Sequence, residues 1–182
     1  MRLTNSEKLI LTMLAEIHEK LEIRDGIDTK LLTSAIYSDN TWALSWEMPG
    51  IVADSLDPTP PIVNEVTNIL GMWSFLEQAY ANFDQPAKDK IKTEADPFGS
   101  HVKFNGFDGN DESEYLSIAQ FLVKDMGRFS LFQGRDLNSH CTSIDSHSRM
   151  FQVFKPIRST LDHHGLSPEQ VIEILQAKRR EA

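Results

Sequence analysis

Residues 59–80 read TPPIVNEVTNILGMWSFLEQAY and form the clearest helical pattern in the chain. Apolar side chains recur every three or four positions from Ile62 to Tyr80, which places them along one face of a helix. Thr59 followed by Pro60 is typical of a helix start, because threonine can cap free amides and proline fits the first turn. A long amphipathic helix must bury its apolar face, so this stretch predicts a long helix with one side in the core.

A second amphipathic pattern begins near the N-terminus. Thr4 and Glu7 have the spacing of a capping box, in which side chain and backbone satisfy each other's free groups. Apolar residues from Leu9 to Leu21 then recur at helical intervals and make one stripe. Gly26 is expected to end this helix, because glycine readily adopts the left-handed conformation found there. We therefore expect this stripe to pack against the rest of the protein.

Shorter helical segments complete the chain. Ser167 and Gln170 have the spacing of another capping box, and Pro156 is expected to bend or stop the helix that begins near Ile144. Other helical segments lie at 28–36, 42–48, 84–95 and 115–126. Since no alternation long enough for a sheet occurs, we expect an all-α multihelical bundle of about seven helices with two polar loops and little or no sheet.

The two polar loops divide the chain. The longer one, residues 96–111, interleaves phenylalanines with glycines, a pattern that usually attaches a loop to a core. The shorter one covers residues 133–142. A length of 182 residues fits one domain. We expect a single helical domain over residues 1–182, with 1–95 and 112–182 as candidate sub-lobes joined by the longer loop.

The charge balance restricts the class of partner. The chain has 18 basic and 27 acidic residues, a formal net charge of −9. This sign disfavours general nucleic-acid binding and anionic membrane surfaces, both of which attract basic proteins. No apolar stretch approaches the length of a membrane span, and the N-terminus lacks the apolar core of a signal peptide. With Cys141 as the single cysteine, these features lead us to expect a cytoplasmic protein without membrane association.

Most motifs with a known chemistry are missing. The sequence holds no phosphate-binding glycine loop, dinucleotide fingerprint, nucleophile elbow or zinc-binding helix motif. Residues 105–112, NGFDGNDE, resemble a calcium loop, but counting from Asp108 places Ala119 where a glutamate is needed. We expect no metal and no cofactor, and we expect Asn110 or Asp111 to cap the following helix.

The most site-like stretch is residues 128–141, RFSLFQGRDLNSHC. Two guanidinium groups in one loop could hold a carboxylate or phosphate, and a histidine beside them could carry a proton. Against this, arginine and aspartate close in sequence often pair with each other, and Asn-Ser-His is ordinary loop chemistry. The candidate ligand-binding residues are Arg128, Arg135, Asp136, Asn138 and His140. No catalytic residue is assigned.

Several segments, in order along the chain, resemble the YfbU family of bacterial proteins. They are residues 3–11, 72–77, 104–112, 114–116, 127–129, 138–140 and 170–175. The resemblance implies a mostly helical, bacterial, cytoplasmic protein that forms oligomers. It implies no catalytic mechanism.

Two functional hypotheses follow. The leading one is a non-enzymatic cytoplasmic regulatory or protein-interaction module, a homo-oligomer or the partner of another protein, that uses helix faces and the two loops. The alternative is a small enzyme or ligand-binding protein that recognises a phosphorylated or carboxylated metabolite through the Arg/His loop. The alternative requires Arg128 and Arg135 to converge on one pocket with their charges not neutralised by carboxylates.

Overall fold

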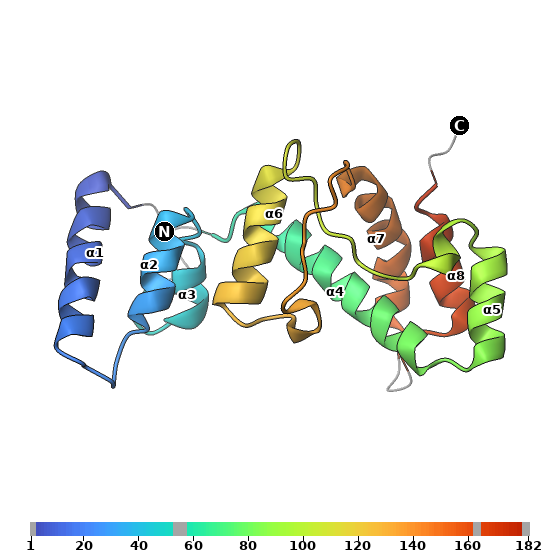
Figure 1. The fold of residues 1–182 in the computed structure, drawn as a ribbon, viewed down its shortest axis with the longest axis horizontal. Coiled ribbons are helices and arrows are strands. Elements are labelled where there is room, and N and C mark those ends of the chain that lie inside the picture. Colours follow the sequence, from blue (N-terminus) through green and yellow to red (C-terminus); the bar gives the residue numbers. More distant parts are fainter. Residues whose placement is uncertain (1–2, 53–57, 162–164, 180–182) are drawn as a thin grey trace.

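A computed structural model describes residues 3–52, 58–161 and 165–179. Within these ranges the chain forms eight α-helices and no strand, which confirms the all-α class (Figure 1). The helices are α1 (Asn5–Lys20), α2 (Thr29–Tyr37), α3 (Ala43–Glu47), α4 (Pro61–Asn82), α5 (Gln85–Glu94), α6 (Ser113–Gln120), α7 (Ile144–Ser159) and α8 (Pro168–Gln176). A π-helical turn, Phe121–Asp125, continues α6.

The helices form an elongated body (Figure 1). α1 lies along α2 and is the outermost helix at one end, and α5 and α8 pack together at the other end. The long helix α4 connects the layers, because it packs against α6, α7 and α8. Helices from both sides of the loop at 96–111 therefore share contacts; the single-domain assignment stays a prediction.

The core is centred on α4, the helix with the clearest sequence pattern. Seven of its side chains are 0–1% exposed: Val63, Val66, Ile69, Leu70, Met72, Trp73 and Leu76. The helix starts at Pro61, one residue later than expected, with Pro60 rather than Thr59 as the N-cap. The Thr59 hydroxyl accepts a hydrogen bond from Trp46 Nε1 at 2.9 Å.

The predicted end of α1 is wrong, and α7 does not stop at Pro156. α1 ends at Lys20, well before Gly26, because Glu22 adopts the left-handed conformation (φ 52°) and Ile23 N donates back to His18 O at 3.3 Å. This arrangement closes the helix without a glycine. α7 continues through Pro156 to Ser159, since side chains on both sides of the proline pack on the core.

Both expected capping boxes are present. Thr4 Oγ1 accepts from Glu7 N while the Glu7 carboxylate accepts from Thr4 N, and Ser167 and Gln170 form the same pair of bonds at the start of α8. These bonds link residues three apart, so the local sequence was enough to predict them.

Candidate functional site

The two polar loops pair with each other. Phe107 N donates to Leu137 O at 2.9 Å, and Ser139 N donates to Phe107 O at 3.0 Å, which makes a short parallel bridge between Phe107 and Asn138. We call this pairing of residues 104–112 with residues 135–143 the loop clasp. These backbone hydrogen bonds hold the two loops together and have a structural role.

Glycine permits the close approach in the loop clasp. Gly106 has φ 100°, and a Cβ there would overlap the carbonyl group of Leu137. Asn138 Oδ1 accepts from Gly109 N and from His140 N, both at 3.0 Å. The side chain of Asn138 thus holds both loops, and its position is explained without a ligand.

Glu112 connects the loop clasp to α7. Its buried carboxylate accepts from Asp108 N at 2.9 Å, from Ser143 N at 2.6 Å and from Ile144 N at 2.7 Å. Burial raises the pKa of this carboxyl, but these amide bonds outweigh it and the pKa lies below its usual range. The expectation that Asn110 or Asp111 caps α6 is wrong: α6 has no side-chain cap, and Glu112 caps α7 instead.

His147 lies beneath the loop clasp and is 2% exposed. Its Nδ1 accepts from Trp73 Nε1 at 3.1 Å, and its Nε2 lies 3.3 Å from Gly106 O, to which it can donate. Burial lowers its pKa to about 4, although the bond to Gly106 acts in the opposite direction. The imidazole is therefore neutral at pH 7 and joins α4, α7 and the loop clasp.

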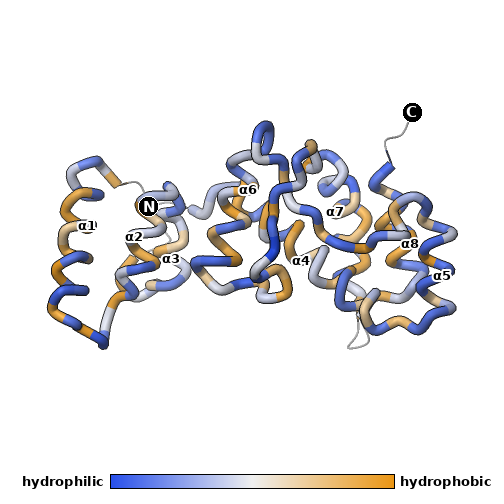
Figure 2. Tube along the Cα trace, in the orientation of Figure 1, coloured by the Kyte–Doolittle hydropathy of each residue, from blue (hydrophilic) through white to orange (hydrophobic). Residues whose placement is uncertain are grey.

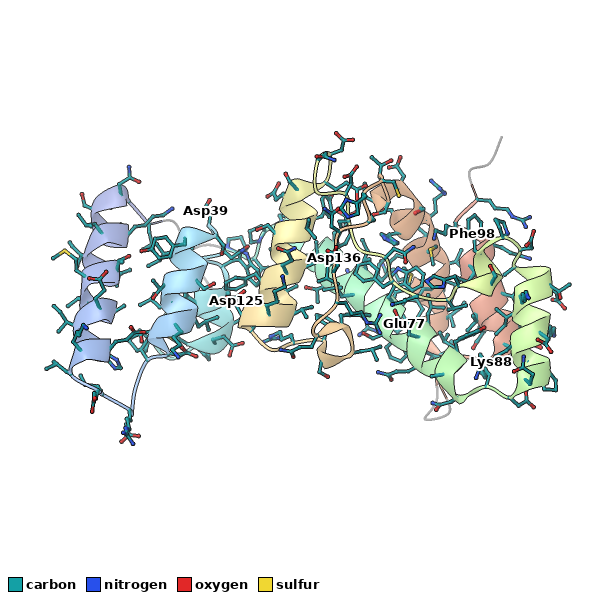
Figure 3. The ribbon with its side chains drawn as sticks, in the orientation of Figure 1. Asp39, Glu77, Lys88, Phe98, Asp125 and Asp136 are labelled. Carbon is teal, nitrogen blue, oxygen red and sulfur yellow. The ribbon has the colours of Figure 1, made fainter. Side chains whose placement is uncertain are left out.

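Arg135, the first candidate anion ligand, is already paired. Its two terminal nitrogens donate to both oxygens of Glu77, at 2.9 and 2.8 Å. Figure 3 labels Glu77 on α4. Glu77 Oε1 also accepts from Phe104 N at 2.7 Å, and the Glu77 side chain is 9% exposed. This two-pronged pair fixes the loop clasp on the central helix.

Arg128, the second candidate, is tied to a different helix. It donates to Glu47 Oε1 on α3 at 2.9 Å and lies over the ring of Trp46 at 5.0 Å. Both arginines therefore have carboxylate partners, and these partners are on different helices. The geometry that the metabolite hypothesis requires is not observed.

The remaining candidates lie on the surface. Asp136 Oδ1 accepts from Asn138 N at 2.9 Å, a local turn bond. Asp136 Oδ2 lies 3.9 Å from His140 Nε2, and both side chains are 73% exposed, so solvent weakens this contact. Across the described ranges of the chain, no three His, Cys, Asp or Glu side chains gather in a way that could hold a metal ion.

Sequence reasoning missed Glu47, Glu77 and Glu112, the carboxylates that hold the polar loops. Only Glu77 has a visible signal, because it is the one charged residue in the otherwise apolar or neutral run from Gly71 to Asn82. Glu47 lies 81 residues from Arg128, and Glu112 lies 31 and 32 residues from Ser143 and Ile144, so no spacing rule connects these partners.

The largest unexplained feature is on α1. Six aliphatic side chains line its outer side and are 51–67% exposed: Leu9, Ile10, Met13, Leu14, Ile17 and Leu21. We call this set the α1 face. Figure 2 shows the apolar positions of α1 at the end of the molecule, away from the central layers. The expectation that this stripe packs against the rest of the chain is wrong.

The opposite side of α1 holds the helix in place. Ala15 is 5% exposed and Leu11 packs on the core, both on the side of α2. Lys8 Nζ donates to Asp39 Oδ1 at 2.9 Å, and Asp39 lies just after the end of α2. α1 is therefore anchored by one side only. Its apolar residues extend around more of the circumference of the helix than α2 can cover.

Two more apolar side chains are exposed just after α1. Ile23 and Ile27, in the turn between α1 and α2, are 47% and 41% exposed. None of the helices in the described part of the chain is long and apolar enough to cross a bilayer.

Comparison with known proteins places the chain in a family. The YfbU domain matches residues 1–177. The UPF0304 protein MJECS11 of Methanocaldococcus jannaschii is 29% identical over 79 residues, which are 41% of this chain and 46% of that protein. The match thus spans about half the length of this relative. The resemblance expected from the sequence is confirmed, and this chain belongs to the YfbU family.

Proposed function

We propose that this chain is a non-enzymatic, cytoplasmic protein-interaction module and that the α1 face is its contact surface. One observation carries the proposal: six aliphatic side chains form a continuous exposed stripe on a helix that is anchored by its other side. Contiguous exposed apolar surface of this kind marks interaction sites on soluble proteins.

The exposed α1 face leaves a large free energy of burial unused. Burying one aliphatic side chain completely contributes about 2 kcal/mol, so six half-exposed ones leave on the order of 6 kcal/mol unused. A whole domain is stable by only roughly 5–15 kcal/mol. A second surface that covered the α1 face would therefore gain a free energy comparable to that of folding, less the entropy lost on association.

The metabolite alternative has less support. An anion at Arg135 would have to displace Glu77, which is held by three hydrogen bonds. An anion at Arg128 would compete with Glu47. A thermal-shift titration with phosphate and with small dicarboxylates tests this alternative, and a saturable rise in melting temperature that Arg135→Met abolishes would favour it.

The proposal predicts that the α1 face is dispensable for folding. The double variant Leu14→Glu/Ile17→Glu should keep its helix content and melting temperature when unfolding is followed by tryptophan fluorescence at sub-micromolar concentration. Ile51→Glu is the matched control, because Ile51 is an apolar residue outside α1 that is 71% exposed. A large drop in melting temperature for the double variant alone would show that the face packs within its own chain, and the proposal would be wrong.

A further inference from the structure

We propose that a second copy of this chain covers the α1 face, with the two α1 helices packed antiparallel about a two-fold axis near Met13 and Leu14. This inference rests on the proposed interaction function and names its partner. It is argued from the position, area and charge of the α1 face.

The position of α1 permits this contact. α1 is the outermost helix at one end of an elongated molecule, and all other helices lie on the side of α2 (Figure 1). Two copies can therefore meet end to end without their bodies colliding. A two-fold interface must be complementary to itself, and a straight apolar stripe about 18 Å long meets this condition when one copy is reversed.

The area of the α1 face is sufficient for a dimer. At the observed exposures its six side chains present roughly 600 Å², the upper end of the largest apolar patch on a typical monomer. Two copies would bury about 1,200 Å² in total, which is where stable, specific interfaces begin.

Charge favours the antiparallel orientation. The first turn of α1 carries Glu7, and its last turn carries His18 and Lys20. Antiparallel packing places Glu7 of one copy level with Lys20 of the other, and it also opposes the helix dipoles favourably; Glu19, in the same last turn as Lys20, lies toward Lys30 on α2. Parallel packing would place like charges together. The other two acids of the helix, Glu16 and Glu19, line a hollow of about 270 Å³ that faces Lys30 on α2.

Charge also argues against a lipid surface. The α1 face has no cluster of basic residues at its border, and the chain has a net charge of −9. Amphipathic helices that bind anionic membranes usually carry lysine and arginine on their polar side. Packing against a second copy of the chain does not require lysine or arginine beside the α1 face.

The oligomeric state gives the first test. Sedimentation equilibrium should show a dimer at micromolar concentration for the natural sequence and for Ile51→Glu. Leu14→Glu/Ile17→Glu should dissociate at least a hundredfold more readily, because its dimer would bury four carboxylates. A natural chain that stays monomeric throughout, or a double variant that dimerises equally well, would overturn the inference.

Disulfide cross-linking tests the relative orientation of the two α1 helices. In a Cys141→Ser background, Met13→Cys should cross-link to itself, since it lies near the axis. Leu9→Cys alone should not, because antiparallel packing separates the two copies of position 9 by about 12 Å, beyond disulfide reach. A mixture of Leu9→Cys and Ile17→Cys should cross-link. Efficient cross-linking of Leu9→Cys alone would overturn the antiparallel arrangement.

The two proposals fail in different ways. If the double variant folds normally at sub-micromolar concentration but the natural chain is always a monomer, the second copy is wrong and the interaction function survives. If the double variant loses its stability as an isolated monomer, the interaction function itself is wrong.

Discussion

α1 and α4 are both amphipathic helices with long apolar stripes, and they reach opposite fates. On α4, the side chains that face the core are 0–1% exposed, because α6, α7 and α8 surround the helix. On α1, six aliphatic side chains are 51–67% exposed, because α2 covers one side only. An apolar stripe therefore predicts that a face will be covered, but it does not say whether the cover comes from the same chain.

The largest expected effect contrasts the two helices directly. Trp73→Ala on α4 should lower the free energy of unfolding by about 4 kcal/mol, because it empties a large buried site and leaves His147 Nδ1 without its donor. Leu14→Ala on α1 should change the stability of the monomer by less than about 0.5 kcal/mol. Urea unfolding at sub-micromolar concentration measures both. Similar losses for the two variants would break the comparison.

The buried histidine against α4 should make stability depend on pH. His147 has a pKa of about 4 in the folded chain and an ordinary value of 6.5 when unfolded, so the unfolded state binds the proton more readily. Stability from this group is complete above pH 6.5 and falls as the pH decreases toward 4, by up to roughly 3 kcal/mol.

His147→Gln provides the check on this pH dependence. The variant should show a flatter stability profile between pH 5.5 and 6.5, a window that lies above the unfolded pKa of 4.5 at which the contribution of a carboxyl such as Glu112 begins to be lost. An unchanged slope of stability against pH in that window would mean that the buried imidazole of His147, between α4, α7 and the loop clasp, does not cause the pH dependence.

The ion pair between Arg135 and Glu77 on α4 should stabilise the chain more than the pair between Arg128 and Glu47 on α3. Arg135→Met leaves the Glu77 carboxylate, 9% exposed, without its counter-ion and should destabilise the chain by about 2 kcal/mol. Arg128→Met is the matched control, because both partners of that pair are more than a third exposed; it should lose less than about 1 kcal/mol. Thermal unfolding of both variants measures the difference, and equal losses would contradict the assignment of Arg135 to the structure.

The smallest effect should occur at Gly71, within α4 itself. A Cβ at Gly71 would meet no atom within 4 Å, so Gly71→Ala should stabilise the chain by up to about 1 kcal/mol through helix propensity. Gly106→Ala is the opposite control, since a Cβ there overlaps the Leu137 carbonyl and the loop clasp should weaken. A destabilised Gly71→Ala would show that α4 is more crowded than its contacts indicate.

The candidate site shows that sequence reasoning does not predict contacts between residues far apart in the chain. The sequence identified the loop residues Arg128, Arg135 and Asn138 as important, but it interpreted them as ligand-binding groups. Their partners, among them Glu47 and Glu77, are 81 and 58 residues away from them in the chain. No local pattern predicts such pairings, because they depend on how the helices pack. The five candidates stay a prediction of a site, with the observed bonds favouring a structural role.

The sequence by itself determined the all-α class, the buried stripe of α4, the capping boxes at α1 and α8 and the family, because each depends on residues a few positions apart or on motifs in order. Only the tertiary structure decided that Glu112 caps α7, that the two polar loops bind each other and that α1 leaves its apolar face open. The physical reason is that burial is a property of pairs of surfaces. A helix carries its apolar stripe wherever it lies, but the surface that covers it is supplied by distant residues or, as we propose for α1, by another molecule.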